Sequence, residues 1–278
     1  MRAAVSSMQL LRPRKLRDAL RMLSEQECVP IAGCTDVLVE LQFGLRQSQV
    51  YLDLSLLDEL RGIRLRRDIL DIGAATTFAD IERSRDVLQR LPILAAAARE
   101  IGGVQIQNRG TLGGNIGNGS PAGDTLPVLA AADAIVVLRS AQQERKIPFN
   151  EFYTGYRQSV RRPDELIVAI EIARVEGRQW FRKVGTRAAQ AISKIVAAGI
   201  RAEQSRFALG SVAPTVKRLP ATEAALVSGS LEAAQQTLQT EISPIDDIRS
   251  TASYRRKVAA NLLAQFWHDT AGDGANQV

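Results

Sequence analysis

Two glycine-containing stretches hold the residue types that can bind a phosphate-bearing ligand. The first reads Ile31-Ala-Gly-Cys-Thr-Asp-Val37, in which an apolar strand runs into Gly33. A tight turn at this glycine would point consecutive backbone N–H groups outward, where they can bind phosphate oxygens, and the Thr35 hydroxyl adds a donor. A plain turn between a strand and a helix explains the same glycine, so this stretch alone leaves both interpretations open.

The second stretch runs from 107 to 124 and combines glycines with amide side chains. Gly113 and Gly114 let the backbone approach a ligand closely, and Asn115 can both donate and accept hydrogen bonds. The Asp124 carboxylate can accept from ribose hydroxyls or cap a helix that begins there, and the two roles are compatible. We expect residues 104–123 to form a long loop outside any helix, and such loops usually serve a function.

Residue counts and motif spacing exclude several other kinds of site. Neither stretch has the Gly-Lys-Ser/Thr of a Walker loop or a Gly-x-Gly-x-x-Gly that opens a helix. Two cysteines, Cys28 and Cys34, and one histidine, His268, are too few for a four-ligand zinc or iron–sulfur site. No disulfide framework is expected either, which favours a cytoplasmic protein. The residues alone therefore predict a dinucleotide held by two separate loops, with no metal.

Composition and charge narrow the class of protein further. The chain has 278 residues, 45% of them hydrophobic and 24% charged, as in a globular protein of two or three subdomains. No apolar run is long enough for a membrane span, and the first 15 residues have no apolar core of a secretory signal. The net charge of +6 could attract a phosphate-bearing cofactor, an acidic partner or nucleic acid. Nucleic acid is disfavoured because the basic residues are dispersed and aromatic residues make up only 5%.

The elements that must position these stretches follow from apolar periodicity and turn residues. In the first half, strands are expected at 29–32, 50–54, 69–74 and 134–138, and helices at 91–100, from the capping-box-like Thr77-Phe-Ala-Asp80, and from Asp124 to 132. In the second half, strands are expected at 166–172, 191–202 and 207–212, the last two antiparallel, and helices near 222–226 and 231–238.

A final helix is expected where Tyr254, Val258, Leu262 and Phe266 recur at every fourth position. A cofactor face would give such a stripe, but packing of a terminal helix on a sheet is the simpler explanation. Residues 271–278 are expected to form a disordered tail. A boundary is expected near residue 175, where charge and Gly177 interrupt the apolar pattern.

Several segments together resemble the FAD-binding subunit of the molybdenum hydroxylases, a family that includes xanthine dehydrogenase, carbon monoxide dehydrogenase and aldehyde-oxidase-type enzymes. The resemblance covers nearly the whole chain, and its specificity comes from the order and spacing of the segments. They are Ala32-Gly-Cys-Thr-Asp36, Leu70-Asp-Ile-Gly-Ala-Ala-Thr-Thr-Phe78, Thr111-Leu-Gly-Gly-Asn-Ile116, Ser120-Pro-Ala-Gly-Asp124, Phe152-Tyr-Thr-Gly-Tyr-Arg157, Pro163-Asp-Glu-Leu-Ile167, Phe181-Arg-Lys-Val-Gly-Thr-Arg187 and Gln190-Ala-Ile192.

The resemblance implies an α+β fold. It consists of a two-lobed, vanillyl-alcohol-oxidase-like (PCMH-type) FAD-binding domain and a small C-terminal domain of antiparallel sheet and helices. We expect the FAD-binding domain at 1–175, with lobes at about 1–57 and 58–175. The C-terminal domain, like that of carbon monoxide dehydrogenase flavoproteins, should occupy 176–278.

The resemblance also implies a set of FAD-binding residues. The loop from Pro30 to Val37 should hold the pyrophosphate through backbone amides, Asp124 should meet the ribose or adenosine half, and Ile167 should touch the flavin or its chain. Lys183, which in a strand would otherwise be taken for a surface lysine, matches a lysine near the isoalloxazine. The full set is Ile31, Ala32, Gly33, Cys34, Thr35, Asp36, Val37, Gly102, Gly110, Thr111, Gly113, Gly114, Asn115, Gly117, Asn118, Asp124, Ile167 and Lys183.

Cys34 departs from the family pattern, since the commonest first loop of the family reads Ala-Gly-Gly-Thr-Asp. A side chain can stand at this place if φ stays negative, so the departure concerns loop geometry more than the cofactor. The thiol could be reactive near a flavin, but a space-filling side chain is the simpler interpretation.

By this resemblance the chain is an oxidoreductase subunit with FAD as its cofactor and no catalytic side chain of its own. Electrons would come from [2Fe–2S] clusters on a small subunit, with molybdopterin on a large subunit, and would leave for NAD or another acceptor. Segments such as Leu60-Arg-Gly-Ile63 and Val212-Ala-Pro-Thr215 look most like bacterial xanthine dehydrogenases and favour a purine substrate. The alternatives are a stand-alone flavin oxidoreductase of the same fold and a scaffold subunit that has lost FAD.

Overall fold

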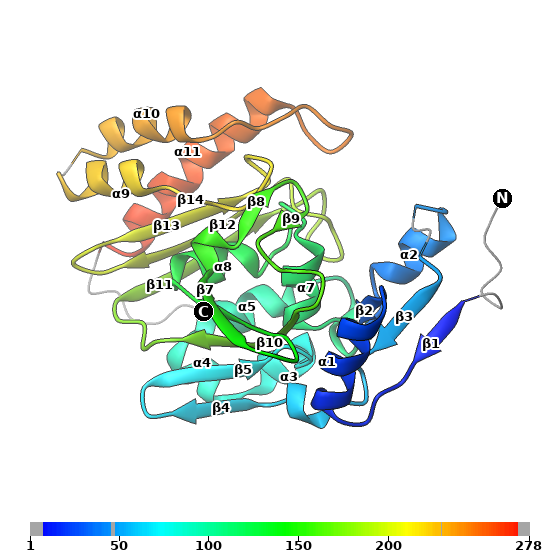
Figure 1. The fold of residues 1–278 in the computed structure, drawn as a ribbon. Coiled ribbons are helices and arrows are strands. Elements are labelled where there is room, and N and C mark those ends of the chain that lie inside the picture. Colours follow the sequence, from blue (N-terminus) through cyan, green and yellow to red (C-terminus); the bar gives the residue numbers. More distant parts are fainter. Residues whose placement is uncertain (1–7, 46–47, 229, 272–278) are drawn as a thin grey trace.

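The computed structural model describes residues 8–45, 48–228 and 230–271, in which three main sheets and their helices form one body (Figure 1). The first sheet is parallel, with the order β1 (Gln9–Leu11), β3 (Val50–Asp53), β2 (Val29–Ile31). Between its strands run α1 (Leu16–Glu25) and the short α2 (Val37–Gln42). Helix α1 buries Leu16, Ala19, Leu20 and Leu23, whose spacing gives it one apolar face.

The second sheet is antiparallel and has β10 (Leu166–Ile172) at its centre. Its order is β4 (Ile63–Arg66), β5 (Ile69–Gly73), β10, β6 (Ile135–Arg139), β7 (Glu144–Pro148). The helices that follow β5 are α3 (Phe78–Arg83), α4 (Arg85–Arg90), α5 (Pro92–Arg99), α6 (Val104–Gln107), α7 (Leu112–Asn118) and α8 (Leu126–Ala131). Two 3-10 turns, η2 (Asp58–Leu60) and η3 (Phe149–Glu151), and a hairpin of β8 (Tyr153–Gly155) and β9 (Gln158–Ser159) complete this part.

The third sheet is antiparallel, with the order β11 (Arg178–Val184), β12 (Ile195–Arg201), β13 (Arg206–Gly210), β14 (Lys217–Arg218). Helices α9 (Pro220–Val227), α10 (Leu231–Glu241) and α11 (Ala252–Asp269) follow it. Ala198, Ala208 and the buried residues of α5 and α8 share one apolar core, so these two helices lie between the second and third sheets. Trp180, Phe207 and Phe266 form a second core under α11.

Most of the expected elements are confirmed with small changes in their bounds. Helix α3 begins with a complete capping box, in which Thr77 accepts from the Asp80 N–H and the Asp80 carboxylate accepts from the Thr77 N–H. Strands β12 and β13 pair antiparallel as expected. The final helix buries Leu262 and Phe266 against the third sheet, although Tyr254 is 40% exposed. The mixed helix-and-sheet class with an antiparallel C-terminal sheet is also confirmed.

Two expectations about the second glycine stretch are wrong. Residues 104–123 are not one long loop, because α6 and α7 lie within them and Gly113, Gly114 and Gly117 are helical. Asp124 does not cap a helix, since α8 begins at Leu126 after Thr125, and the Asp124 carboxylate bonds other side chains. Helix α1 and strand β11 had no counterpart among the expected elements. The expected tail, apart from Ala271, lies outside the described residues.

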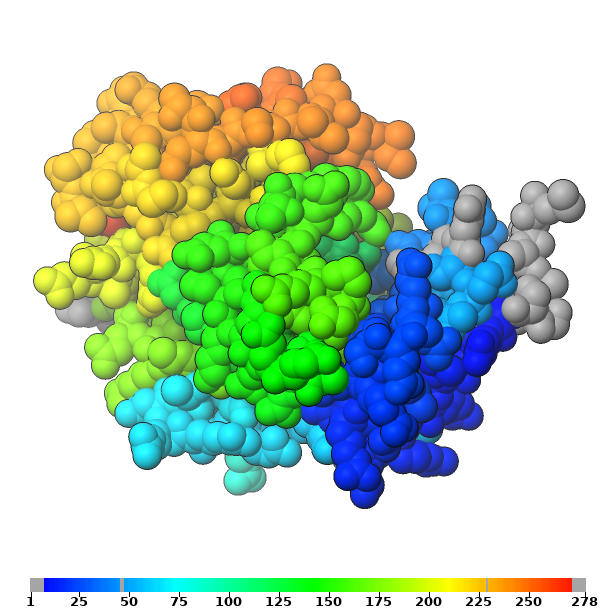
Figure 2. All heavy atoms as spheres, viewed as in Figure 1, coloured from blue at the N-terminus to red at the C-terminus, as the bar shows by residue number. Residues whose placement is uncertain are grey.

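No helix in the described ranges is long and apolar enough to cross a membrane. The space-filling view shows the N-terminal sheet and its helices, in blue, beside the rest of the body, with a notch between them and the C-terminal helices in orange (Figure 2).

Candidate functional site

A cavity of about 930 Å³ lies where the three sheets meet, and it is bordered by apolar and polar residues of every part of the fold. Its walls include the segment 29–37, helix α7, the start of β10 and the segments 190–193 and 211–214. Every site residue predicted from the sequence borders this cavity except Lys183. A volume in this range is typical of ligand sites in proteins.

The first loop is shaped by close packing at Gly33 and by a left-handed residue at Cys34. A Cβ on Gly33 would lie 1.9 Å from the Arg109 carbonyl oxygen, so this glycine brings the first loop against the second stretch. The left-handed turn itself falls on Cys34, whose φ is 61°. The condition for an unstrained side chain there, a negative φ, is therefore not met, and Cys34 adopts a conformation that glycine adopts without strain.

The thiol of Cys34 is half-buried, and its Sγ lies 3.6 Å from the Ala32 carbonyl oxygen. Burial raises the pKa of this thiol, the Asp53 carboxylate raises it further, and Arg109 opposes both. A thiol held in its protonated form is a weak nucleophile, which favours the space-filling interpretation over a reactive one.

Backbone N–H groups of the first loop are available to a ligand. Within the described ranges, the N–H groups of Thr35, Asp36 and Val37 have no hydrogen-bond acceptor, whereas the next one, of Leu38, donates to the Cys34 carbonyl. All three residues border the cavity. Consecutive free N–H groups in a turn of this kind bind phosphate oxygens.

Helix α7 presents bare backbone to the cavity. The Thr111 hydroxyl accepts from the Gly114 N–H and starts the helix. A Cβ on Gly113 would lie 2.6 Å from that of Ala74, so this glycine serves packing on the end of β5. A Cβ on Gly117 would have only Ile167 Cδ1 nearby, at 3.8 Å, and one on Gly114 only the Thr111 hydroxyl. The face of α7 with Gly114 and Gly117 is therefore open to a ligand.

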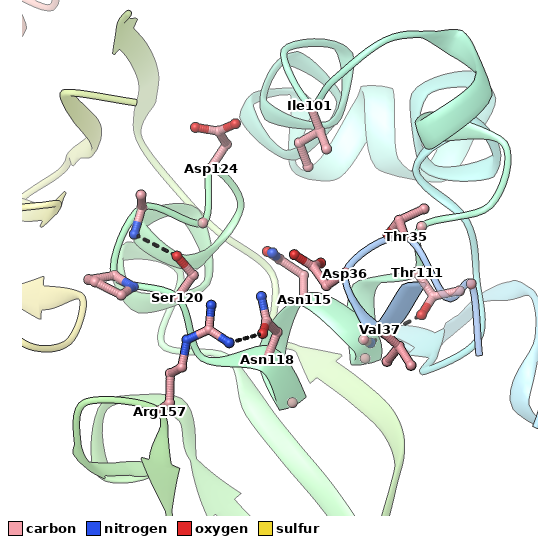
Figure 3. Close-up of a pocket in the computed structure, with 18 of the residues that line it drawn as sticks. Thr35, Asp36, Val37, Ile101, Thr111, Asn115, Asn118, Ser120, Asp124 and Arg157 are labelled. Atoms are coloured by element: carbon pink, nitrogen blue, oxygen red, sulfur yellow. Dashed lines mark hydrogen bonds between the residues drawn. The ribbon is translucent and has the colours of Figure 1, made fainter. Parts of the chain in front are cut away.

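Asp124 lies at the edge of the cavity opposite Thr35 and Thr111 (Figure 3). Its Oδ2 accepts from Lys183 Nζ at 2.7 Å, and its Oδ1 accepts a short hydrogen bond from Ser193 Oγ. Lys183 Nζ also donates to the Glu100 carbonyl, at 2.7 Å. Burial raises the pKa of Asp124, against the opposing effects of Lys183 and Ser193.

Lys183 itself is buried behind Asp124, with 6% of its side chain exposed, and is not a surface lysine. It does not border the cavity. In this arrangement the influence of its charge on a ligand passes through the Asp124 carboxylate, which it largely neutralises.

Arg157 joins two walls of the cavity and was missed as a site residue, although its segment was noted. One nitrogen of its guanidinium, Nη1, lies 2.9 Å from Glu40 Oε1 on α2 and 2.9 Å from Asn118 Oδ1 on α7, and Figure 3 shows the second of these bonds. Burial raises the pKa of the neighbouring Asp36, while Arg157 lowers it. The guanidinium thus fixes α2, which buries no residue of its own, to the body of the protein.

The C-terminal part of the chain supplies cavity residues that no local sequence pattern had indicated. Ser193 and Ser211 border the cavity near Asp124, and Asp247, Arg249 and Arg255 border it beyond them. Asp247 accepts from Arg255 Nη2 at 2.8 Å, which ties the segment before α11 to that helix. These residues approach the first half only through the folding of the third sheet.

Comparison with known families is decisive for this chain. Residues 6–174 match the FAD binding domain in molybdopterin dehydrogenase, and residues 179–270 match the CO dehydrogenase flavoprotein C-terminal domain. The chain belongs to the FAD-binding subunits of the molybdenum hydroxylase family. The resemblance, the fold and the cofactor expected from the sequence are thereby confirmed.

Members of this family match the chain over most of its length. The putative xanthine dehydrogenase FAD-binding subunit of Escherichia coli is 33% identical over 88% of this chain and 89% of its own. The carbon monoxide dehydrogenase medium chain of Hydrogenophaga pseudoflava is 29% identical over 90% of this chain and 92% of its own. A solved carbon monoxide dehydrogenase from Hydrogenophaga pseudoflava, lacking the Mo-pyranopterin moiety, superposes with a TM-score of 0.88 at 27% identity, over 93% of this chain and 95% of that one.

Proposed function

We propose that this FAD-binding subunit receives electrons from [2Fe–2S] clusters on a small partner subunit and passes them through FAD to NAD or another acceptor. A large partner subunit would hold the molybdopterin. Bound FAD would supply the electron-transfer chemistry. The chain's own residues bind and orient the dinucleotide and shield it from water.

The observation that carries the proposal is the cavity with free N–H groups at one edge and a bare helix face in its wall. The N–H groups of Thr35, Asp36 and Val37 would hold the pyrophosphate, as part of the loop 30–37. Because these donors are fixed by the fold, they need no rearrangement to bind an anion. Three donors can bond more oxygens than a single carboxylate offers, which favours a diphosphate.

The remaining predicted residues would line the dinucleotide along the cavity. The open face of α7, with Gly114 and Gly117, would lie against it, and Ile167 would supply an apolar contact. Asn115 keeps its amide NH₂ for the ligand, because its Oδ1 already accepts from the Thr125 hydroxyl at 2.6 Å. Asp124 would accept from the ligand with the lone pairs that Lys183 and Ser193 leave free.

The domain division near residue 175, with lobes at about 1–57 and 58–175, remains a proposal, as does a cytoplasmic location. A purine substrate for the complex is supported by the likeness to the Escherichia coli subunit. The carbon monoxide dehydrogenase medium chain and the nicotine 6-hydroxylase medium subunit match this chain with similar identities, 29% and 30%. The substrate pocket of such a complex would lie on another chain.

The proposal is tested on the protein purified from its native host together with the chains that accompany it. We expect a flavin absorption spectrum with about one FAD per chain, and co-purification of a molybdopterin protein and a [2Fe–2S] protein. Assays of the complex against purines, other N-heterocycles, aldehydes and CO would identify its substrate. Absence of FAD both after purification and after reconstitution would refute the proposal.

Two variants at one position test the location of FAD. Among the described residues the methyl group of Gly117→Ala meets only Ile167, and alanine favours the helix, so the chain should stay folded and FAD content should fall only slightly. Gly117→Val extends further into the cavity, and FAD content should fall at least tenfold while the chain stays folded. A chain that purifies alone but with FAD would instead favour a stand-alone flavin oxidoreductase.

A further inference from the structure

Ser193 lies in the segment between β11 and β12 and is almost completely buried, with 1% of its surface exposed. It borders the cavity, and its hydroxyl donates a short hydrogen bond to Asp124 Oδ1. The two residues are 69 positions apart in the chain. The contact therefore joins the second half of the chain to the cavity wall formed by the first half.

The partners of Asp124 divide its two oxygens between them. Lys183 Nζ donates to Oδ2 at 2.7 Å, and the Ser193 hydroxyl donates to Oδ1. An ionised carboxylate can accept about four hydrogen bonds, so acceptor capacity remains for a ligand in the cavity. With one bond on each oxygen, the carboxylate can no longer rotate, and the direction of its remaining lone pairs is fixed.

The backbone of Ser193 is itself held in place by a hydrogen bond from Ser211. The Ser211 hydroxyl donates to the Ser193 carbonyl at 3.2 Å. The Ser211 N–H donates to the Pro121 carbonyl at 2.7 Å, in the segment that leads directly to Asp124. Ser211 therefore bonds both the residue that donates to Asp124 and the segment that carries Asp124. These two bonds hold the donor and the acceptor in a fixed relative position.

We propose that Ser193 is a positioning residue of the FAD site, which orients the Asp124 carboxylate toward the bound dinucleotide. This inference rests on the proposed function, since it assumes that FAD occupies the cavity. Lys183 alone would leave Oδ1 without a partner and the carboxylate free to turn about its bond to Lys183. The hydroxyl of Ser193 removes this freedom and also stabilises the ionised form of the buried carboxylate.

The test uses the purified complex in wild-type form and with Ser193→Ala or Ser193→Thr. Ser205→Ala is the matched control, because Ser205 is also buried, bonds only a backbone carbonyl and does not border the cavity. FAD is removed, and FAD affinity is measured by flavin fluorescence over a range of pH. Thermal unfolding without FAD reports on the fold separately.

We expect Ser193→Ala to bind FAD about tenfold more weakly, the loss typical of one hydrogen bond to a charged group, because the Asp124 carboxylate is no longer oriented to accept from the dinucleotide. The pH below which affinity falls should rise by about one unit, since the ionised carboxylate has lost a donor. Ser193→Thr should restore much of the affinity and the wild-type pH profile, and Ser205→Ala should match the wild type in both.

A Ser193→Ala protein with the FAD affinity and pH profile of Ser205→Ala would overturn the inference, even though the FAD site itself stood. If Ser193→Ala does not fold, Ser193→Cys replaces it, because a thiol keeps the size but donates weakly. The FAD affinity of Ser193→Cys should lie between that of the wild type and the tenfold weaker affinity expected without the hydroxyl. Wild-type FAD affinity in Ser193→Cys would overturn the inference. Failure of the wild-type complex to bind FAD would instead refute the proposed function.

Discussion

Gly33 lies with its Cα directly against the backbone of Arg109, so closely that a Cβ on Gly33 would come within 1.9 Å of the Arg109 carbonyl oxygen and 2.6 Å of its carbonyl carbon. The two glycine stretches that border the cavity are therefore joined by backbone packing as well as by any ligand between them. The carbonyl oxygen and carbon of Arg109 cannot turn away from such a Cβ as a side chain could, because both atoms belong to the main chain.

Gly33→Ala should consequently destabilise the protein by about 3 kcal/mol, the upper part of the range for overpacking. FAD content should fall with it, since the loop must move away from Arg109. Urea unfolding and flavin absorbance measure the two effects. Gly44→Ala is the control: Gly44 is left-handed but has open space around it, so only about 1 kcal/mol of backbone strain is expected. Equal losses in the two variants would contradict the packing at Gly33.

Cys34→Gly should stabilise the protein by about 1 kcal/mol and retain FAD. The φ of 61° costs an L-residue roughly 1–2 kcal/mol, and glycine's greater freedom in the unfolded chain offsets part of that gain. Cys34→Val should destabilise the protein, because a β-branched side chain tolerates this φ poorly. Unfolding of both variants in urea without FAD gives the comparison. A destabilised Cys34→Gly would show that the Cys34 side chain contributes more than its backbone strain costs.

Lys183→Met should cost about 3–5 kcal/mol, because it leaves the buried Asp124 carboxylate without its cation. The double variant Lys183→Met/Asp124→Asn should be less destabilised than the sum of the two single variants, as expected for residues in direct contact. A double-mutant cycle from urea unfolding measures this coupling. Additive losses would mean that the 2.7 Å ion pair contributes little net free energy.

The buried Asp124 should also leave a signature in the pH dependence of stability. Burial, the largest influence, raises its pKa in the folded protein, above about 3.9 in the unfolded chain. The folded state therefore binds this proton more tightly. The stability of wild type relative to Asp124→Asn should be highest below about pH 4 and should decline as the pH rises through the higher folded value. Unfolding of both proteins across acidic pH tests this, and a difference that grows with pH would contradict it.

Arg157→Gln should weaken FAD binding about threefold with little change in unfolding temperature. Its guanidinium joins Glu40 on α2 to Asn118 on α7, but 41% of the side chain is exposed, so the bonds are modest in strength. Arg174→Gln serves as control, because Arg174 pairs with Glu176 away from the cavity. High salt should weaken FAD binding less in Arg157→Gln than in wild type. An unchanged affinity would show that α2 is held without this residue.

The sequence predicted those parts of the fold that depend on neighbours along the chain. The capping box at Thr77 and the alternation in β10 are local signals, and both elements lie where they were expected. Helix α7 was missed because glycine at three of its positions disfavours a helix. It forms nevertheless, because Thr111 caps it and Gly113 lets it approach Ala74, a contact that no local pattern reveals.

The site could be predicted to the extent that it is built from short motifs. The loop around Gly33 and the stretch around Asn115 both border the cavity. The partners of Asp124 could not be predicted in the same way. Lys183 reaches it from β11, and Ser193 reaches it from the segment that follows. Their meeting depends on how the third sheet packs on helices α5 and α8, which the spacing of residues in the sequence does not encode.

The walls of the cavity are formed by segments far apart in the sequence, which the ribosome synthesises at different times. The loop at Thr35 is made well before Ser211 and Arg255. The cavity is thus closed only when α11 has reached the third sheet. Cofactor loading is therefore expected to follow the synthesis of Arg255, and a chain that stops before this residue would leave one wall of the cavity open to water.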